Sequence, residues 1–569
     1  MTSRLPYRGA VLSAFVALTL PLATSAQTMG YGNVGSGGDA GGDSATSKSG
    51  DRGKDARGPR GRGRVEVTPY IEAAQIVTAD LSPGNEVLTY SVLAAGLDAT
   101  IAGRNNAASA SVRYEHRFGW GKAEDSDFVS GIARGYATVV PGVRIEAGAL
   151  AARTSIDQSG TGALSQIADG NAVTHTYSVY GGPSVKTHAG DVAIDASYLI
   201  GYTKIDADNG VTSAPLRADV FDESTAQMAN VHAGVKAGDV LPVGIGAGAG
   251  YYREDISNLD QRVEDFHARA DVAVPLTNTV QLVGGIGYED VEISGRDALR
   301  DGAGLPVVGS DGRYVVDETS PRILAYDVEG LIWDAGVIWR PSKRTALEAH
   351  VGRRYGSTSY YGSFAYAPTS RSALNISVYD NVAGFGGQLN RALAGLPTDF
   401  QATRNPLTGN IGGCVASLEG GNCLSGVLGS VRSATFRARG VMATYGIDLG
   451  RLQTGIGAGY DRRKFIAAPG TVLASANGVV DENYWLAAYL NGRIDQRSSF
   501  STNVYANWFQ TGTGFGGDAT LVGATAAYYR SLTNRLSATA ALGLDGISRA
   551  DPLEDVWSAS ALVGVRYSF

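Results

Sequence analysis

Apolar and polar side chains alternate along most of this chain from Val65 onward, in segments of about ten to fifteen residues. Successive side chains of a β-strand point to opposite faces, so a period of two predicts strands with one apolar and one polar face. In the segment 191–203, one face carries Val192, Ile194, Ala196, Tyr198, Ile200 and Tyr202, and the other carries Asp191, Asp195, Ser197 and Thr203. The segments 265–274 and 483–495 divide in the same way.

The connections between these segments switch between short and long. Short connections rich in turn-forming residues occur near 140–142, 187–190, 239–242, 275–278, 340–343, 368–370, 450–451, 497–498 and 532–534. Longer and more polar connections lie between many of them, such as 153–171, 204–223, 291–321, 383–430 and 467–478. This arrangement is typical of an all-β, transmembrane, antiparallel up-and-down β-barrel, with short periplasmic turns and long outer loops. We count about 22 strands, within a range of about 20 to 24, and bacterial single-chain barrels have even numbers.

The last strand supports a membrane barrel over a soluble fold. Apolar and aromatic side chains occupy every second position and end at Phe569, while the alternate positions are mostly small or polar. A soluble β-sandwich or propeller explains neither the terminal aromatic residue nor the switching connections. Outer-membrane barrels end in a similar strand, and that resemblance implies that the barrel-assembly machinery reads Phe569 as an assembly signal.

The residues before the first strand divide into two parts. Basic residues precede an apolar run from Ala10 to Leu22, and the small residue Ala26 suits cleavage, so residues 1–26 are predicted to be a secretory signal peptide. Residues 27–64 are rich in Gly and Ser and then basic, which predicts a disordered periplasmic arm. The arm either contacts anionic lipid or peptidoglycan or serves as a solubilising tether. Residues 65–569 form the barrel.

Composition narrows the function classes. The 569 residues include 77 Gly and 28 Tyr but only 4 Met, which is unlike a helical core. A net charge of −7 is modest and argues against nucleic acid as a partner. The sequence has no G-x-S-x-G or H-E-x-x-H motif and no Cys/His cluster, so we predict no enzyme, no cofactor and no metal site. The glycine runs 244–248 and 455–459 alternate as strand positions, and they make room either for a pore or for neighbouring side chains.

The long predicted outer loop 383–430 contains two features. Cys414 and Cys423 are expected to form a disulfide in the oxidising periplasm. Upstream, Leu389, Ala392, Leu393 and Leu396 have the spacing of a short amphipathic helix that ends before Pro397. The helix either packs on the barrel rim or forms a constriction inside the lumen.

Charged side chains are the remaining candidates for a functional site. Arg437 and Arg439 alternate with Phe436, Ala438 and Gly440, so we expect both arginines to point into the lumen. The full set of candidate lumen-lining residues is Arg437, Arg439, Arg451, Arg463, Glu348 and Asp461. Lining charges of both signs produce a transverse field and a wet pore, although solvated structural ion pairs are the alternative interpretation. The loop 383–430 would then partly occlude the pore.

The start of the barrel resembles a family of outer-membrane β-barrels associated with exopolysaccharide and exosortase (PEP-CTERM) loci. The resemblance lies in Val65–Ala73, Thr78–Asp80, the strand Thr89–Thr100 and the later passage Val431–Tyr445. It implies a pore-type protein that serves surface polysaccharide export or the associated envelope. The implied partners are outer-membrane lipid and lipopolysaccharide, the barrel-assembly machinery and polysaccharide export components.

Other barrel classes compete with this interpretation. A substrate-selective or general porin for small solutes is the main alternative, and a structural surface barrel with a closed lumen is the third. A TonB-dependent receptor needs a folded plug and an autotransporter needs a passenger domain, and the residues before Val65 are too few for either. We therefore expect no plug domain and a location in the bacterial outer membrane.

Overall fold

The computed structural model describes residues 64–156, 162–163, 173–207, 220–398, 400–416, 424–428, 431–512, 518–549 and 554–569. The predicted signal peptide and all of the predicted arm except Arg64 lie outside the described residues. The expectation that no plug domain precedes the barrel also concerns that region and stays a prediction.

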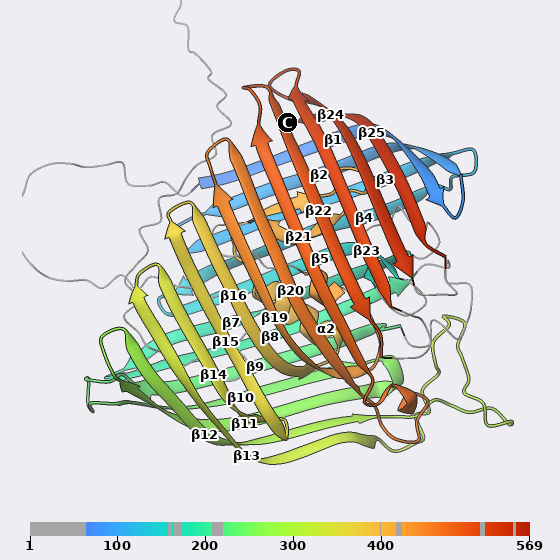
Figure 1. Ribbon diagram of the computed structural model, residues 1–569. Helices are drawn as coiled ribbons and strands as arrows, with labels where there is room; N and C mark the ends of the chain where they lie inside the picture. Colours follow the sequence, from blue (N-terminus) through green and yellow to red (C-terminus); the bar gives the residue numbers. More distant parts are fainter. Residues whose placement is uncertain are drawn as a thin grey trace, which may run out of the picture.

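Twenty-two antiparallel strands form a closed ring, which confirms the all-β, up-and-down architecture (Figure 1). Consecutive strands pair around the ring, and β1 pairs with β25 to close it, with Tyr70 opposite Ser568. The strands are β1 (Arg64–Ser82), β2 (Val87–Ala102), β3 (Asn106–Trp120), β4 (Ser126–Val140), β5 (Val143–Ile156), β7 (Val173–Ala189), β8 (Val192–Ala207), β9 (Glu223–Val235), β10 (Gly244–Ile256), β11 (Gln261–Pro275), β12 (Val280–Gly295), β13 (Ile323–Ser342), β14 (Thr345–Arg354), β15 (Ser357–Thr369), β16 (Ser372–Ala383), β19 (Thr435–Asp448), β20 (Leu452–Ile466), β21 (Val480–Arg493), β22 (Ser498–Gln510), β23 (Ala519–Ser531), β24 (Leu536–Arg549) and β25 (Val556–Ser568).

Short elements lie between the ring strands. They are β6 (Gly162–Ala163), the helix α2 (Phe385–Ala394), the hairpin of β17 (Gln401–Arg404) and β18 (Ile411–Ala416), the helix α3 (Ser425–Leu428), and two 3₁₀ turns at Asn258–Asp260 and Ala474–Ala476. None of the helices in the described part of the chain is long and apolar enough to cross a membrane.

The alternation seen in the sequence separates the two faces of the barrel wall. Tyr198, Ile200 and Tyr202 of β8 are exposed on the outside, whereas the intervening Gly201 and Thr203 are buried on the inside. The terminal strand behaves in the same way, with Val563 69% exposed. A strand of 13 residues, such as β22, spans roughly 43 Å along its axis and roughly 33 Å after a tilt of about 40°. The wall is therefore tall enough to cross a bilayer core.

The two ends of the barrel differ, as the connections predict. The turn Pro141–Gly142 and the other short turns gather at one end, and Figure 1 shows these tight hairpins opposite the longer loops. The N–H of Phe569 donates to the carbonyl of Pro69 at the short-turn end. Four connections at the long-loop end are also short, at residues 83–86, 121–125, 257–260 and 355–356. The role of Phe569 in assembly stays a prediction.

The glycine runs make room for neighbouring side chains. A Cβ added at Gly455 would lie 2.4 Å from the ring of Tyr489, and one at Gly459 would lie 2.5 Å from the ring of Trp485. A Cβ at Gly246 would meet the imidazole of His232. Because these glycines lack side chains, neighbouring rings lie flat against the inner wall.

Candidate functional site in the barrel lumen

The described residues between β16 and β19, namely 384–398, 400–416, 424–428 and 431–434, fold into the lumen, and we call them the lumenal segment. Figure 1 shows α2 and the small hairpin inside the ring of strands. The predicted amphipathic helix exists as α2, and it lies inside the barrel, not on the rim. Leu389, Leu393 and Leu396 are buried against Ile132 and Leu150, two inward-facing residues of β4 and β5.

A carboxylate on the barrel wall holds the start of α2. Glu254 of β10 accepts hydrogen bonds from the N–H of Gly384 at 2.7 Å and from the N–H of Gly387 at 2.9 Å. The Ser224 hydroxyl also donates to Glu254, whose residue is 0% exposed. The first N–H groups of a helix have no partner within the helix, and the N-terminal end of the dipole favours negative charge. Glu254 therefore replaces an N-cap side chain that Gly384 cannot supply.

The polar side of α2 forms hydrogen bonds with side chains of the barrel wall. The Asn390 carbonyl oxygen accepts a hydrogen bond from the Ser178 hydroxyl of β7 at 3.0 Å, and its amide contacts the Thr203 hydroxyl of β8 at 3.3 Å. Asn390 is fully buried. A Cβ at Gly201 would collide with the Asn390 amide, so glycine at that wall position is required for the close approach. The helix is therefore held at both its apolar and its polar side.

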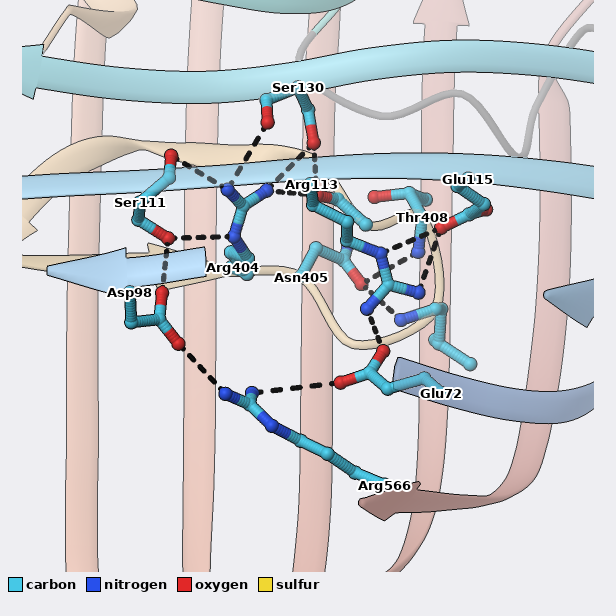
Figure 2. A network of polar contacts seen from close by, with 12 residues as sticks. Glu72, Asp98, Ser111, Arg113, Glu115, Ser130, Arg404, Asn405, Thr408 and Arg566 are labelled. Carbon is cyan, nitrogen blue, oxygen red and sulfur yellow. Dashed lines mark hydrogen bonds and ion pairs between the residues drawn. The ribbon is translucent and has the colours of Figure 1, made fainter. Parts of the chain in front are cut away.

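Arg404 anchors the hairpin to β3 and β4, next to the strands that hold α2 (Figure 2). Its guanidinium donates to the hydroxyl and carbonyl oxygens of both Ser111 on β3 and Ser130 on β4, at distances from 2.7 to 3.2 Å. It also donates to the carbonyl of Gly409 within its own hairpin, at 2.9 Å. A guanidinium has five N–H donors in a rigid plane, so one side chain satisfies all of these acceptors.

Ion pairs brace the wall beneath this anchor (Figure 2). Arg113 of β3 pairs with Glu115 at 2.9 Å and with Glu72 of β1. Arg566 of β25 pairs with Asp98 of β2 at 2.8 Å and lies 3.6 Å from Glu72. The network therefore crosses the closure of the ring between β25 and β1.

The tip of the hairpin reaches a further part of the wall. The Asn405 side-chain oxygen accepts the N–H groups of Leu407 and Thr408, which folds the tip into a tight turn. Arg117 of β3 donates to the carbonyls of the same two residues. Leu407 is buried in a cluster whose other buried members are Ile76, Val92, Ala527, Ala541 and Leu562, from β1, β2, β23, β24 and β25. The contacts of the lumenal segment thus include the wall from β10 through β1 to β23.

Three of the residues named from the sequence lie on the inner face. Arg463 pairs with Asp461 at 2.7 Å and donates to the carbonyl of Val427 in α3, at 3.1 Å. Its guanidinium also lies over the Phe436 ring, 4.9 Å from the ring centroid. Glu348 of β14 is buried beside His350, 3.2 Å from the imidazole. These charges are engaged with the protein itself.

The expected inward orientation of Arg437 and Arg439 is wrong. Both share a strand face with Val441 and Tyr445, which are exposed on the outside, whereas Phe436 is buried on the inside. The sequence pattern was misassigned because this part of the inner face packs against protein and is apolar. Phe436, Ala438 and Phe465 form one buried cluster there.

The two arginines instead close a gap between β15 and β16. The pairing of these strands stops at Gly362 opposite Val378, so the upper part of β15 lacks a ladder partner on this side. Arg439 donates to the Thr358 carbonyl at 2.8 Å, and Arg437 donates to the Ser357 hydroxyl at 2.6 Å. Both pair with Asp380, at 3.2 and 2.7 Å, respectively. They therefore replace missing backbone hydrogen bonds in the wall.

Arg451 also differs from the expectation. It lies exposed in the short turn between β19 and β20, outside the strands, so it does not line the lumen. The predicted disulfide cannot be placed, because Cys423 and the side chain of Cys414 lie outside the described residues. Among the residues that the structure does describe, no group of three or more His, Cys, Asp or Glu side chains is arranged to hold a metal ion.

A second charged network, which we call the charged corner, lies on the inner faces of β11, β13 and β14. Its residues are Asp265, Arg269, Asp334, His350 and Arg354. Asp334 accepts two hydrogen bonds from Arg269, at 2.9 and 3.0 Å, and contacts His350 at 2.9 Å. Arg354 of β14 reaches across to Asp265 of β11 at 2.7 Å. These contacts therefore connect strands that are not adjacent, β11 with β13 and with β14.

Sequence reasoning missed the main anchors of the lumenal segment. Arg404 is a lone basic residue in a polar loop, and Glu254 is one acid in the strand segment Arg253-Glu254-Asp255. The available signal for Glu254 was its position, because it continues the inward-facing period of Gly246, Gly248 and Gly250. A carboxylate at the end of a glycine-lined face is suited to receive an incoming segment.

No protein-family model and no curated protein matches this chain. Among solved structures it is similar to the FrpB iron transporter from Neisseria meningitidis (F5-1 variant), with 12% identity, 88% of this chain and 82% of that chain covered, and a TM-score of 0.42. It is similar to the alcaligin outer membrane receptor FauA from Bordetella pertussis, with 11% identity, coverage of 88% and 76%, and a TM-score of 0.38. It is also similar to the open form of the ferric-catecholate import receptor Fiu from E. coli K12, with 10% identity, 88% of this chain and 81% of that chain covered, and a TM-score of 0.40. At these identities and TM-scores the likenesses carry no argument about function.

Proposed function

We propose that this protein is an outer-membrane β-barrel channel whose lumen is closed by its own lumenal segment and conducts when that segment moves. A closed ring with an apolar, aromatic outer face is one of the two structures that satisfy all backbone polar groups in hydrocarbon. Aromatic side chains such as Trp339, Tyr366 and Tyr445 are exposed near the short-turn end, as expected for an interfacial girdle.

The burial of Leu407 against the far wall is the observation that carries the proposal. The lumenal segment leaves the wall at β16 and enters it again at β19, yet its tip packs on β1 and β23–β25. A barrel of about 22 strands encloses an aqueous lumen unless something fills it. A segment that reaches across this lumen restricts flow, whereas a segment that packs on the rim does not.

The contacts of the segment are suited to a closed channel that opens when a ligand or partner replaces some of them. Its anchors are the Glu254 carboxylate and the Arg404 guanidinium, which form charge-assisted hydrogen bonds worth about 1.5–3 kcal/mol each. Glu254 belongs to the wall and binds the start of α2, whereas Arg404 belongs to the segment and binds β3 and β4. Movement of the whole segment therefore requires both sets of hydrogen bonds to break. A ligand or partner that replaces one set lowers the cost of opening.

We propose surface polysaccharide export, or the envelope that accompanies it, as the biological role. This part of the proposal rests on the resemblance of Val65–Ala73 and Val431–Tyr445 to the exopolysaccharide-associated barrels. A porin for small solutes remains the alternative, and it predicts conduction without movement of the lumenal segment. A structural barrel predicts no conduction in either state.

Planar-bilayer recordings test the channel proposal. Residues 389–424 are replaced by a short Gly/Ser linker, and the single-channel conductance of this variant is compared with that of the full chain. We expect a several-fold increase, because lumen cross-section governs ion flow. Equal conductance would favour the porin, and no conductance in either protein would favour the structural barrel.

A reversible crosslink provides the matched control. A Cβ added at Gly543 would lie 2.3 Å from Cδ1 of Leu407, so Leu407→Cys with Gly543→Cys places two thiols within disulfide reach. The pair is introduced in a chain with Cys414→Ser and Cys423→Ser. The oxidised protein should show almost no openings, and reduction should restore them. If oxidation leaves the openings unchanged, the Leu407 contact is not part of the gate.

A further inference from the structure

We propose that the inner faces of β21 and β22, which we call the neutral wall, form a binding track for an uncharged saccharide chain. This inference deepens the proposed channel function by naming the class of substrate. The inner-face positions of β21 from Asn483 to Asn491 and of β22 from Ser499 to Phe509, all within the described residues, hold no charged side chain. They hold amides, hydroxyls and aromatic rings instead.

The aromatic rings of the neutral wall form a staggered series. Trp485 and Tyr489 lie on β21, and Tyr505 lies on β22 opposite Ala487, so the three residues are spaced along the strands in steps of two positions, about 6.6 Å. The rings of Trp485 and Tyr489 extend over β20, and the ring of Tyr505 extends over β23. Each ring covers an inward-facing glycine, since Cβ atoms at Gly459, Gly455 and Gly523 would meet Trp485, Tyr489 and Tyr505, respectively. Trp485 is buried, whereas Tyr489 and Tyr505 are partly exposed, so the latter two rings present a face to the lumen.

Asparagines stand directly beside these rings. Asn507 is opposite Trp485, and Asn503 is opposite Tyr489. The Asn507 side-chain oxygen and both polar atoms of the Asn483 side chain are buried without a hydrogen-bond partner. Buried amides normally have partners, so these atoms are suited to groups that the closed protein does not supply.

This combination matches the chemistry of a sugar. The C–H face of a pyranose ring packs on the electron-rich face of an aromatic ring. Sugar hydroxyls both donate and accept hydrogen bonds, and an asparagine amide offers a donor and an acceptor in one plane. A wall without charge does not attract ions or an acidic polymer. A neutral saccharide is therefore favoured over an anionic one.

Coverage of the track differs along its length. Trp485 and Asn507 are buried, in the half of the strands nearest the long-loop end. Tyr489 and Asn503, nearer the short turns, are partly exposed. A saccharide can therefore reach the lower part of the track while the segment is in place. Binding there does not depend on gating.

Calorimetric titration of the full-length protein in detergent, with maltoheptaose as the neutral probe, tests the track. We expect Asn503→Ala and Tyr489→Ala each to weaken binding about tenfold, and Tyr489→Phe to retain it because the ring face remains. Asn230→Ala is the matched control, because Asn230 is also a partly exposed, inward-facing asparagine but lies on β9. Protease protection of each variant shows that the barrel has folded.

The outcomes separate this inference from the channel proposal. Absence of maltoheptaose binding, an equal loss with Asn230→Ala, or tighter binding of an oligogalacturonate or a neutral Gly/Ser peptide would overturn the saccharide track. The gating recordings use only ions, so they can succeed while the track fails. Binding that follows the neutral wall in a barrel that never conducts would retain the track and reject the channel.

Discussion

The charged corner and the neutral wall are both inner faces of one barrel, but their buried polar side chains differ in whether they have partners within the protein. In the corner, Arg269 reaches across β12 to Asp334 of β13, and the Asp334 side chain is 0% exposed. On the neutral wall, Asn483 and Asn507 are as deeply buried and yet retain polar atoms without partners. In the corner each arginine lies beside carboxylates of the protein itself, whereas the amides of the neutral wall have no charged partner among the described residues and retain polar atoms without a hydrogen bond.

The positions of glycines explain part of this difference. Gly285 separates Arg269 from Asp334, and a Cβ there would lie 2.4 Å from the guanidinium, so glycine opens the path for a contact across strands. Beside the neutral wall, glycines of β20 and β23 are covered by rings that belong to the wall, as Gly455 is by Tyr489. Glycine therefore brings charges together in one region and creates flat aromatic surfaces in the other. We infer that the corner maintains shape and that the wall meets the solute.

The largest expected effect on the free energy of unfolding comes from removing an ion pair of the charged corner. Asp334→Ala leaves Arg269 buried without its bidentate acceptor, and we expect the free energy of unfolding to fall by about 3–5 kcal/mol. Asn507→Ala on the neutral wall removes an oxygen that has no partner, and we expect a loss below about 1 kcal/mol. Urea unfolding in lipid vesicles measures both. Similar losses would show that the two regions do not differ in the proposed way.

We expect a slightly smaller loss in the free energy of unfolding from changes at the gap between β15 and β16. Arg437→Glu with Arg439→Glu places two acids beside Asp380, whose side chain is 0% exposed, and we expect unfolding to become easier by about 3 kcal/mol. Ion selectivity should stay unchanged, because both arginines lie in the β15–β16 gap and not along the lumen. A strong shift toward cations in bilayer recordings would contradict this placement.

The gate should respond to a single wall residue. Glu254→Gln keeps the shape of the side chain but removes the charge that faces the start of α2, at a cost of about 1.5 kcal/mol, equivalent to roughly a tenfold rise in opening frequency. Glu264→Gln, on the outer side of β11 in a partly exposed ion pair, is the control and should have no effect. Equal opening frequencies in the two variants would remove Glu254 from the gating mechanism.

The smallest expected effect concerns Tyr505, where an aromatic ring of the neutral wall contacts a charged side chain. The Tyr505 hydroxyl donates to Asp545 of β24 at 3.0 Å, and it is the point at which an aromatic ring of the neutral wall is tied to a charge. Tyr505→Phe should lower the free energy of unfolding by about 1 kcal/mol. Maltoheptaose affinity should remain unchanged, because the ring face is preserved. A large loss of affinity would show that the hydroxyl, not the ring, contacts the saccharide.

The sequence by itself determined the ring of strands, the direction of most side chains and the existence of α2. These features follow from local rules, since a period of two fixes the faces of a strand and the spacing of Leu389, Leu393 and Leu396 fixes a helical face. The inward positions of Asp461 and Arg463 could be read in the same way.

Only the tertiary structure decided what occupies the lumen. The alternation around Arg437 was read with the wrong face inside, because an inner wall that packs against another part of the chain becomes as apolar as one that faces lipid. The partners of Glu254 lie at Gly384 and Gly387, and those of Arg404 lie at Ser111 and Ser130, between 130 and 293 residues away in the sequence. No local pattern encodes such contacts, because they exist only once the ring has closed and the lumenal segment has entered it.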